Sequence, residues 1–222
     1  MAATVVTVPY GGLPGPPVTA ALRDRVESTL VPAEAIASRV RELAAEIHDA
    51  YPGVPRIVML VVLKGAFVFA ADLGRAIQKA CGPEVEFQFV RTSTYGAEMK
   101  QDGEEQRAVS VSHLPESLLG HHVLLVDDLI DQGFTLQRLL GILAAAGATS
   151  LKVCTLLAKQ LRLPSQRVAA LRRDIQLDFV GFELPDRWVS GYGIDAGGED
   201  LRCLPEVVAI NQGFYRTPGF SG

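Results

Sequence analysis

The chain has 222 residues, a formal net charge of −4 and 48% hydrophobic residues. This length and composition suit one domain with a substantial core, and the acidic balance argues against a general affinity for nucleic acid. No stretch reaches the roughly 18 consecutive apolar residues of a membrane span. The three cysteines, Cys81, Cys154 and Cys203, lack the paired spacing of a disulfide framework. We therefore expect a cytoplasmic α/β protein without a nucleic-acid or membrane partner.

Residues 1–17 are rich in glycine and proline and lack the basic start and apolar block of a signal peptide. They predict a flexible extension, followed by a single domain over residues 18–222. A helix is predicted from Ala33, because Pro32 stands just before its first turn. The apolar residues of this helix recur at helical spacing, at Ile36, Val40, Leu43 and Ile47.

Residues 57–63 form an unbroken apolar run, which is typical of a central parallel strand covered on both faces. Residues 67–80 predict a helix, and residues 85–91 alternate as a strand. Residues 96–108 are polar and poorly patterned, which predicts a mobile lid loop over about 93–110. Further strands are predicted at residues 123–126, 151–157, 179–182 and 207–210. Such alternation predicts a doubly wound, mostly parallel sheet flanked by helices, which binds ligands beyond the carboxyl ends of its strands.

The most informative segment is residues 124–136, LLVDDLIDQGFTL. An apolar strand ends in Asp127 and Asp128, Asp131 follows, and Gly133 allows a tight turn into a helix. The free N–H groups and the positive end of that helix would form an anion cradle. Carboxylates do not bind phosphate directly, so they imply a sugar hydroxyl, a proton acceptor or a metal ion. An ordinary strand–helix turn with solvated acids is the alternative interpretation.

The stretch VDDLIDQGFTL resembles the phosphoribosyl-pyrophosphate loop of type I phosphoribosyltransferases, in their 6-oxopurine branch. Further stretches fit that branch in the same order, namely VVLKGAF, STYG, LLAK and DFVGFELPDRWVSGYGID. The likeness covers roughly residues 30–212. Over this range the chain resembles the hypoxanthine-guanine phosphoribosyltransferase family. It implies a small hood built from the N- and C-terminal segments, Mg²⁺ as cofactor, and a homodimer or homotetramer. The implied reaction joins phosphoribosyl pyrophosphate to hypoxanthine, guanine or both.

The resemblance gives Asp131 the role of the catalytic base that takes a proton from the purine. A helix N-cap is the alternative role for this residue. Asp127 and Asp128 would hold the ribose hydroxyls, directly or through Mg²⁺, since adjacent like charges need a cation or donors between them. The ribose and the 5′-phosphate would be bound by the whole loop, which comprises Asp127, Asp128, Leu129, Ile130, Gln132, Gly133, Phe134 and Thr135.

Two loop residues depart from the family pattern. Gln132 stands where threonine is common, and Phe134 stands where lysine or arginine is common. The backbone donors of the cradle survive both changes, whereas one hydroxyl and one cation are lost. We expect Phe134 to face solvent, with packing beneath the loop as the alternative.

Pyrophosphate binding is implied for Lys64 and Gly65, where glycine permits a close backbone approach to an anion. The resemblance also implies a cis peptide bond before Lys64. Asp195 matches the aspartate that holds magnesium on the pyrophosphate. Arg202 would reach the same pyrophosphate, although its spacing from Asp195 is one residue longer than the family pattern. Without the resemblance, Lys64 would equally suit an ordinary surface cap at a strand end.

Purine binding is implied for Lys159 and for Arg187, Trp188 and Val189. An ammonium group only donates hydrogen bonds, so Lys159 suits the 6-oxo oxygen of hypoxanthine or guanine and disfavours the 6-amino group of adenine. Trp188 would stack on the base, although a single tryptophan is more often a core residue. The resemblance places the lid motif at Ser93, Thr94 and Tyr95.

Two other interpretations stay open. A regulatory phosphoribosyltransferase-like protein with little catalysis would explain the departures at Gln132 and Phe134. The second alternative is a phosphoribosyltransferase that acts on adenine or a pyrimidine, and Lys159 disfavours it. Against the regulatory interpretation, Asp131, Lys159 and Asp195 are all retained, and no basic patch is visible.

Overall fold

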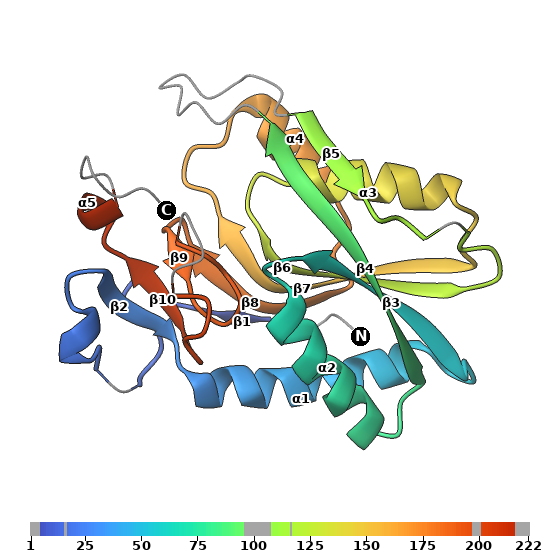
Figure 1. Ribbon diagram of the computed structural model, residues 1–222, viewed down its shortest axis with the longest axis horizontal. Helices are drawn as coiled ribbons and strands as arrows, with labels where there is room; N and C mark the ends of the chain where they lie inside the picture. Colours follow the sequence, from blue (N-terminus) through green and yellow to red (C-terminus); the bar gives the residue numbers. More distant parts are fainter. Residues whose placement is uncertain (1–4, 16, 96–107, 116, 197–200, 216–222) are drawn as a thin grey trace.

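The computed structural model describes residues 5–15, 17–95, 108–115, 117–196 and 201–215 (Figure 1). A seven-stranded sheet forms the centre of the fold, and its strands lie in the order β1-β8-β7-β6-β3-β4-β5. All neighbouring strands of this sheet are parallel except β5, which runs antiparallel to β4. The strand bounds are β1 Val6–Thr7, β3 Arg56–Leu63, β4 Glu84–Tyr95, β5 Ala108–Ser112, β6 His122–Ile130, β7 Ser150–Gln160 and β8 Phe179–Pro185.

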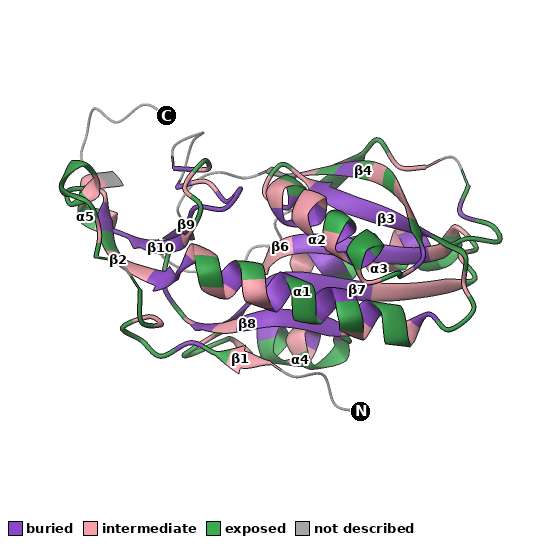
Figure 2. Ribbon diagram, turned by 90° about the horizontal axis from the view of Figure 1, so that it is seen from below, coloured by how far each residue is buried: buried purple, intermediate pink, exposed green. Residues whose placement is uncertain are grey.

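Helices cover both faces of this sheet (Figure 2). Strand β3 shows why both faces need cover. Its successive side chains point to opposite faces of the sheet and enter two separate cores. Met59 packs in one core with helices α1 and α2, whereas Leu60 packs in the other with α3 and α4. The doubly wound α/β fold is thus confirmed. The helix bounds are α1 Ala33–Ala50, α2 Phe67–Lys79, α3 Phe134–Ala145, α4 Gln166–Asp174 and α5 Gln212–Tyr215, with a 3₁₀ turn at Ala20–Leu22.

A second, three-stranded sheet stands beside the first (Figure 1). It consists of β2 Val26–Val31, β10 Val207–Ile210 and β9 Val189–Ser190, all antiparallel. The sheet joins an early segment to two late ones, and it therefore corresponds to the expected hood of N- and C-terminal segments. Within the described part of the chain, no helix is both long and apolar enough to cross a membrane.

The sequence predicts a flexible extension over residues 1–17, and this prediction is wrong for residues 5–15. Val6 and Thr7 pair in parallel with β8, and the side chain of Val8 is only 2% exposed. The amide of Leu13 donates to the carbonyl of Leu30 at 2.8 Å. A strand of two residues is too short to produce an alternating pattern, so the sequence gives no sign of it.

Several strands extend further than their apolar cores predict. Strand β6 continues through both aspartates to Ile130, and β7 continues to Gln160. Strand β4 reaches Tyr95 and pairs with β5 from Ala108 onward. The expected lid loop at 93–110 is therefore wrong at both ends, and residues 96–107 lie outside the described part of the chain.

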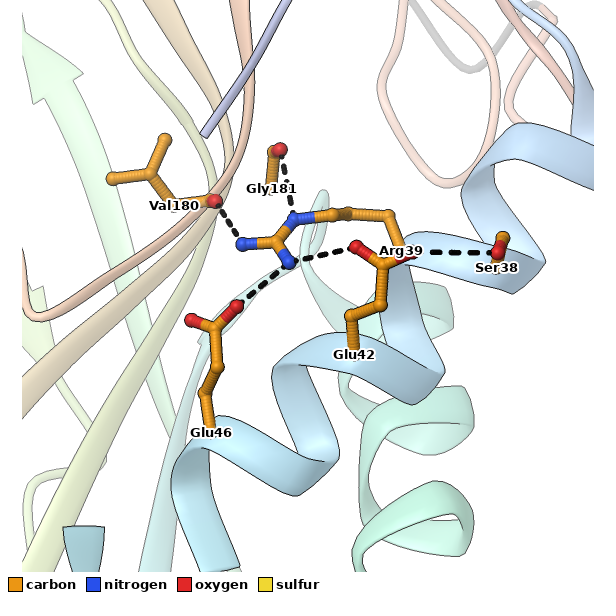
Figure 3. Close-up of polar contacts among 6 residues, drawn as sticks. All are labelled: Ser38, Arg39, Glu42, Glu46, Val180 and Gly181. Atoms are coloured by element: carbon orange, nitrogen blue, oxygen red, sulfur yellow. Dashed lines mark hydrogen bonds and ion pairs between the residues drawn. The ribbon is translucent and has the colours of Figure 1, made fainter. Parts of the chain in front are cut away.

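Arg39 fastens helix α1 to strand β8 (Figure 3). Its guanidinium is almost fully buried and donates to the carbonyls of Val180 and Gly181 at 2.9 and 3.1 Å. The same group pairs with Glu42 and Glu46 at 3.0 and 2.7 Å. A buried charge is tolerated because each side of the fork has a partner, so one side chain joins a helix to the backbone of a strand.

We expect Arg39→Met to lower the free energy of unfolding by about 3 to 5 kcal/mol, because two buried carbonyls and a partly buried carboxylate lose their partner. Urea denaturation followed by circular dichroism measures the change. Arg41→Met is the matched control, since Arg41 is exposed on the same helix. Equal stability of the two variants would show that the Arg39 network contributes nothing.

Candidate active site

A cavity of about 640 Å³ opens at the carboxyl ends of β3, β6 and β7. This edge is where ligands bind in doubly wound sheets. Much of the predicted site meets there, because each motif follows or ends a strand of the same sheet. The predicted residues that line the cavity are Gly65, Asp127, Asp128, Leu129, Ile130, Asp131, Gln132, Gly133, Phe134, Thr135, Lys159, Trp188, Val189 and Asp195.

The turn into helix α3 forms an anion cradle of backbone donors. Gly133 is the N-cap of the helix and has a φ of +94°, which a residue with a side chain rarely adopts. A Cβ at this position would also lie 2.6 Å from the side chain of Leu171 and 2.8 Å from that of Ile175. The first turn of α3 thus presents its free N–H groups and its positive dipole end to the cavity.

The structure excludes one alternative for this turn and corrects one expectation. Gly133 is the N-cap, so Asp131 does not cap the helix and stays available for chemistry. Phe134 does not simply face solvent, because its ring is partly buried and packs on the core beneath the loop. The guanidinium of Arg167 lies over that ring, 5.5 Å from its centre.

The carboxylates of Asp127 and Asp128 lie near the carboxyl end of strand β6 and accept hydrogen bonds from backbone donors. The amide of Asp128 donates to Asp127 at 3.1 Å, and the amide of Leu129 donates to Asp128 at 2.9 Å. Burial raises the pKa of Asp127 well above its usual range, and the neighbouring charge of Asp128 raises it further. Burial also raises the pKa of Asp128, while its hydrogen bonds lower it. The pair is therefore suited to hydroxyl donors or to a cation, either of which would offset its charge.

Three backbone segments meet closely beside Asp128. A Cβ on Gly65 would lie 1.7 Å from the Asp128 carboxylate, and a Cβ on Gly193 would lie 2.3 Å from the carbonyl of Gly65. Only glycine fits at both positions. The peptide bond between Leu63 and Lys64 is cis, as the sequence predicts.

A second cavity of about 390 Å³ adjoins the first and shares Gly65, Asp128 and Asp195 with it. Lys64 and Arg202 line this second cavity. Arg202 donates to the carbonyl of Gly193 at 2.7 Å and pairs with Asp195. Both cations thus line the same cavity as Asp195, despite the additional residue between Asp195 and Arg202 in the sequence.

Arg91 also lines the second cavity, and the sequence analysis missed it. It lies on strand β4 opposite Leu63 of β3, one residue before the cis peptide bond. The only sequence signal is its position near the carboxyl end of an alternating strand.

Asp131 and Lys159 form an ion pair inside the larger cavity. The ammonium nitrogen lies 3.1 Å from a carboxylate oxygen of Asp131. The Lys159 side chain is 7% exposed, whereas that of Asp131 is 50% exposed. A buried cation is therefore held beside a carboxylate that remains open to a ligand. Trp188, also at the cavity, is 45% exposed and offers an aromatic surface.

Arg187 is not among the residues that line the two cavities, and its side chain is bound elsewhere. Its guanidinium donates to the carbonyl of Tyr10 and the hydroxyl of Ser28 at 3.0 and 3.2 Å. It also pairs with Glu27 at 2.6 Å and stacks on the Tyr10 ring. Arg187 therefore joins the N-terminal segment to the second sheet.

The lid residues Ser93, Thr94 and Tyr95 lie in strand β4, and their side chains are outside the described structure. Thr92, just before them, lines both cavities.

Within the described residues, no group of three or more histidine, cysteine, aspartate or glutamate side chains could hold a metal ion. Asp128 and Asp195 nevertheless line the same two cavities. Mg²⁺ prefers oxygen ligands and usually keeps substrate or water among them. The carboxylates therefore fit an ion that is bound jointly with a polyanionic substrate.

Comparison with known proteins agrees with this arrangement. The phosphoribosyl transferase domain family matches residues 27–196. The chain is 38% identical to the hypoxanthine-guanine phosphoribosyltransferase of Aquifex aeolicus, over 85% of this chain and 97% of that protein. It is 40% identical to the hypoxanthine phosphoribosyltransferase of Buchnera aphidicola, over 76% and 87%. A crystal structure of a hypoxanthine-guanine phosphoribosyltransferase from Bacillus anthracis has a TM-score of 0.68 at 34% identity, covering 84% of this chain and 99% of that one.

We expect Asp127→Asn to raise the thermal unfolding midpoint at pH 7, measured by calorimetry in EDTA without substrate. Burial raises the pKa of Asp127, so its stabilising contribution is complete below the unfolded pKa of about 4 and is lost as pH rises through the folded pKa. Asparagine does not titrate, and it keeps the acceptor for the Asp128 amide. The difference between variant and wild type should therefore shrink as pH falls toward about 4.

The exposed Asp24 provides the control for this experiment, because Asp24→Asn removes a carboxylate that solvent already stabilises. A wild-type protein that is more stable than Asp127→Asn at pH 7 would contradict the prediction.

Proposed function

The chain belongs to the phosphoribosyl transferase domain family, and from that premise we propose that it is a purine salvage enzyme. It transfers the phosphoribosyl group of phosphoribosyl pyrophosphate to hypoxanthine, guanine or both, with IMP or GMP and pyrophosphate as products. The observation that carries the proposal is the Asp131–Lys159 ion pair in the same cavity as the α3 cradle. The names of the relatives from Aquifex aeolicus and Buchnera aphidicola support it.

The ion pair matches one edge of a 6-oxopurine. The 6-oxo oxygen and N7 lie side by side on that edge, and a free base can carry a proton on N7. Lys159 has three donors, so it can hold Asp131 at 3.1 Å and still donate to the oxo group. Asp131, half exposed, would then accept the N7 proton. Adenine offers an amino donor in place of the oxo acceptor, which leaves one donor of the buried ammonium unpaired.

The remaining residues suit phosphoribosyl pyrophosphate. The 5′-phosphate would lie in the cradle formed by residues 131–135, with backbone N–H groups as its main donors. Asp127 and Asp128 would accept hydrogen bonds from the ribose hydroxyls. Lys64 and Arg202, which line the adjoining cavity, would hold the pyrophosphate. Trp188 would stack on the purine, a contact that contributes about 1–3 kcal/mol per base.

The reaction exchanges one bond at C1′ of the ribose for another. The bond to the pyrophosphate oxygen breaks, and a purine ring nitrogen forms the new bond to C1′. Positive charge develops on the ribose ring, as in glycoside cleavage, and the carboxylates of Asp127 and Asp128 would help to stabilise it. The purine proton passes to Asp131, and its transfer neutralises the ring as the new bond forms.

We propose that Asp127, Asp128 and Asp195 bind Mg²⁺ together with the ribose hydroxyls and the pyrophosphate. The raised pKa values of Asp127 and Asp128 support this, because a cation would offset the charge that burial makes costly. When bound, the ion would offset the charge of the departing pyrophosphate.

The departures at Gln132 and Phe134 favour a regulatory nucleotide-binding protein as the second candidate. Their weight is limited, because the cradle depends on Gly133 and the backbone of α3. The retained Asp131–Lys159 pair has no evident use in a protein without catalysis, and it favours the enzyme.

We expect the purified protein to convert hypoxanthine or guanine to its mononucleotide when phosphoribosyl pyrophosphate and Mg²⁺ are supplied. Adenine should react at least 10²-fold more slowly, as an order-of-magnitude estimate from the unpaired buried donor. Chromatography of reactions with hypoxanthine, guanine, xanthine and adenine gives the ranking, and EDTA should abolish turnover. Binding of GMP without turnover of any purine would support the regulatory candidate instead.

We expect Asp131→Asn to lower kcat by roughly 10²–10⁴-fold, because the amide cannot accept the purine proton. Binding of phosphoribosyl pyrophosphate, followed by calorimetry, should change little, since the cradle donors are on the backbone. Asp174→Asn is the control, because Asp174 is an exposed carboxylate on α4. Turnover near that of the wild type would remove Asp131 from the role of base.

A further inference from the structure

We propose that Arg172 is a positioning residue that sets the spacing between Asp131 and Lys159. This inference rests on the proposed function, because it deepens the account of the same site. Arg172 lies in the last turn of α4 and is not among the residues that line the cavity. It would not touch substrate, and it acts through the backbone of the two residues that do.

The guanidinium of Arg172 bridges the carboxyl ends of two neighbouring strands. One nitrogen donates to the carbonyl of Lys159 at 3.0 Å, and another donates to the carbonyl of Ile130 at 3.4 Å. Ile130 immediately precedes Asp131. A single planar group therefore holds the backbone of the purine-reading lysine and the backbone next to the proposed base.

The bridge lies where the sheet itself stops holding these residues together. The pairing between β6 and β7 ends at Ile130 and Ala158, so Asp131 and Lys159 stand one residue beyond it. Lys159 is still paired with Leu184 of β8, but no β6–β7 pairing holds its backbone against that of the half-exposed Asp131. Arg172 supplies a tie from outside the cavity, through donors that the ligand does not displace.

Neighbouring residues of α4 fix Arg172 in place. Leu171 and Ile175 are buried and lie against Gly133, so the helix is packed directly on the cradle. Burial lowers the pKa of Arg172, and the charges of Asp131 and Glu183 oppose that effect. Arg173, the next residue, has a side chain that is 79% exposed and pairs only loosely with Asp174 at 4.0 Å. Two adjacent arginines thus differ sharply in environment.

The geometry requires a fork, not only a positive charge. An arginine guanidinium presents several donors in one plane, and here two of them reach two carbonyls. A lysine ammonium at residue 172 would keep the charge near Asp131 but could not reproduce the planar bridge. The pair of substitutions Arg172→Lys and Arg172→Met therefore separates geometry from charge.

The test compares steady-state kinetics of wild type, Arg172→Met, Arg172→Lys and the control Arg173→Met, with the thermal midpoint of each protein. We expect Arg172→Met to lower kcat/KM for hypoxanthine or guanine by roughly 10²-fold, the size expected from a misplacement of about 1 Å. The KM for phosphoribosyl pyrophosphate should stay within about twofold, because the cradle is held by Leu171 and Ile175. The kcat/KM of Arg173→Met should match that of the wild type. Arg172→Lys should recover less than half of the loss in kcat/KM, counted on a logarithmic scale.

A double-mutant cycle excludes a merely structural effect. If Arg172 acts through Asp131, then Arg172→Met in the Asp131→Asn background should cost much less than it does alone. Equal losses in both backgrounds, or full recovery in Arg172→Lys, would overturn the positioning role. Arg172→Lys keeps the side-chain stem and the charge, so it provides the comparison even if the methionine variant does not fold.

The outcome for the wild type separates the two proposals. A wild type that turns over a purine, together with an equally active Arg172→Met, would overturn only the role of Arg172. A folded wild type that converts no purine would overturn the proposed function and this role with it.

Discussion

The packing of Gly65 against Asp128 is the constraint on which the rest of the site depends. No Cβ fits at residue 65, and none fits at Gly193, which closes on the carbonyl of Gly65 from the other side. Three segments that are far apart in the sequence therefore meet at one point. Because they meet there, the carboxylates of β6, the cation Lys64 and the segment carrying Asp195 and Arg202 share two adjoining cavities. A single additional methyl group would have to displace the Asp128 side chain at residue 65, or the carbonyl of Gly65 at residue 193.

In the same region, the adjacent charges of Asp127 and Asp128 are electrostatically unfavourable, and the surrounding fold tolerates them. Two adjacent carboxylates, one buried and one partly buried, lie near the carboxyl end of β6, and burial raises the pKa of both. Such an arrangement is unfavourable in an empty protein and becomes favourable only with partners that neutralise it. Elsewhere the fold avoids this cost, as at Arg39, where a buried charge finds two carbonyls and two carboxylates within the chain. The contrast supports the proposed binding role of the β6 carboxylates and a structural role for the Arg39 network.

The sequence predicts the central strands and most of the site because both depend on local patterns. The apolar run of β3 and the helical spacing in α1 are set by burial, and the site motifs follow strands whose ends meet at one edge. The sequence gives no sign that the Arg187 side chain binds Tyr10, Ser28 and Glu27, because those partners come from a distant part of the chain. Arg172 escapes notice because arginines in the last turn of a helix look like ordinary partners of its dipole. Strand β1 has too few residues to leave any periodic signal.

The pairing of β1 with β8 has a consequence for how the chain reaches its native state. Thr7 contacts Glu183 across 176 positions of the sequence, and β2 pairs with β10 over a similar distance. Closing such long loops carries the largest loss of chain entropy in the molecule. The contacts that offset this loss cannot form until the intervening sheet exists. The parallel core from β3 to β8 can therefore assemble first, and the two termini close over it last. Because β9 of the second sheet follows Trp188 directly, the stacking surface is completed only in that final step.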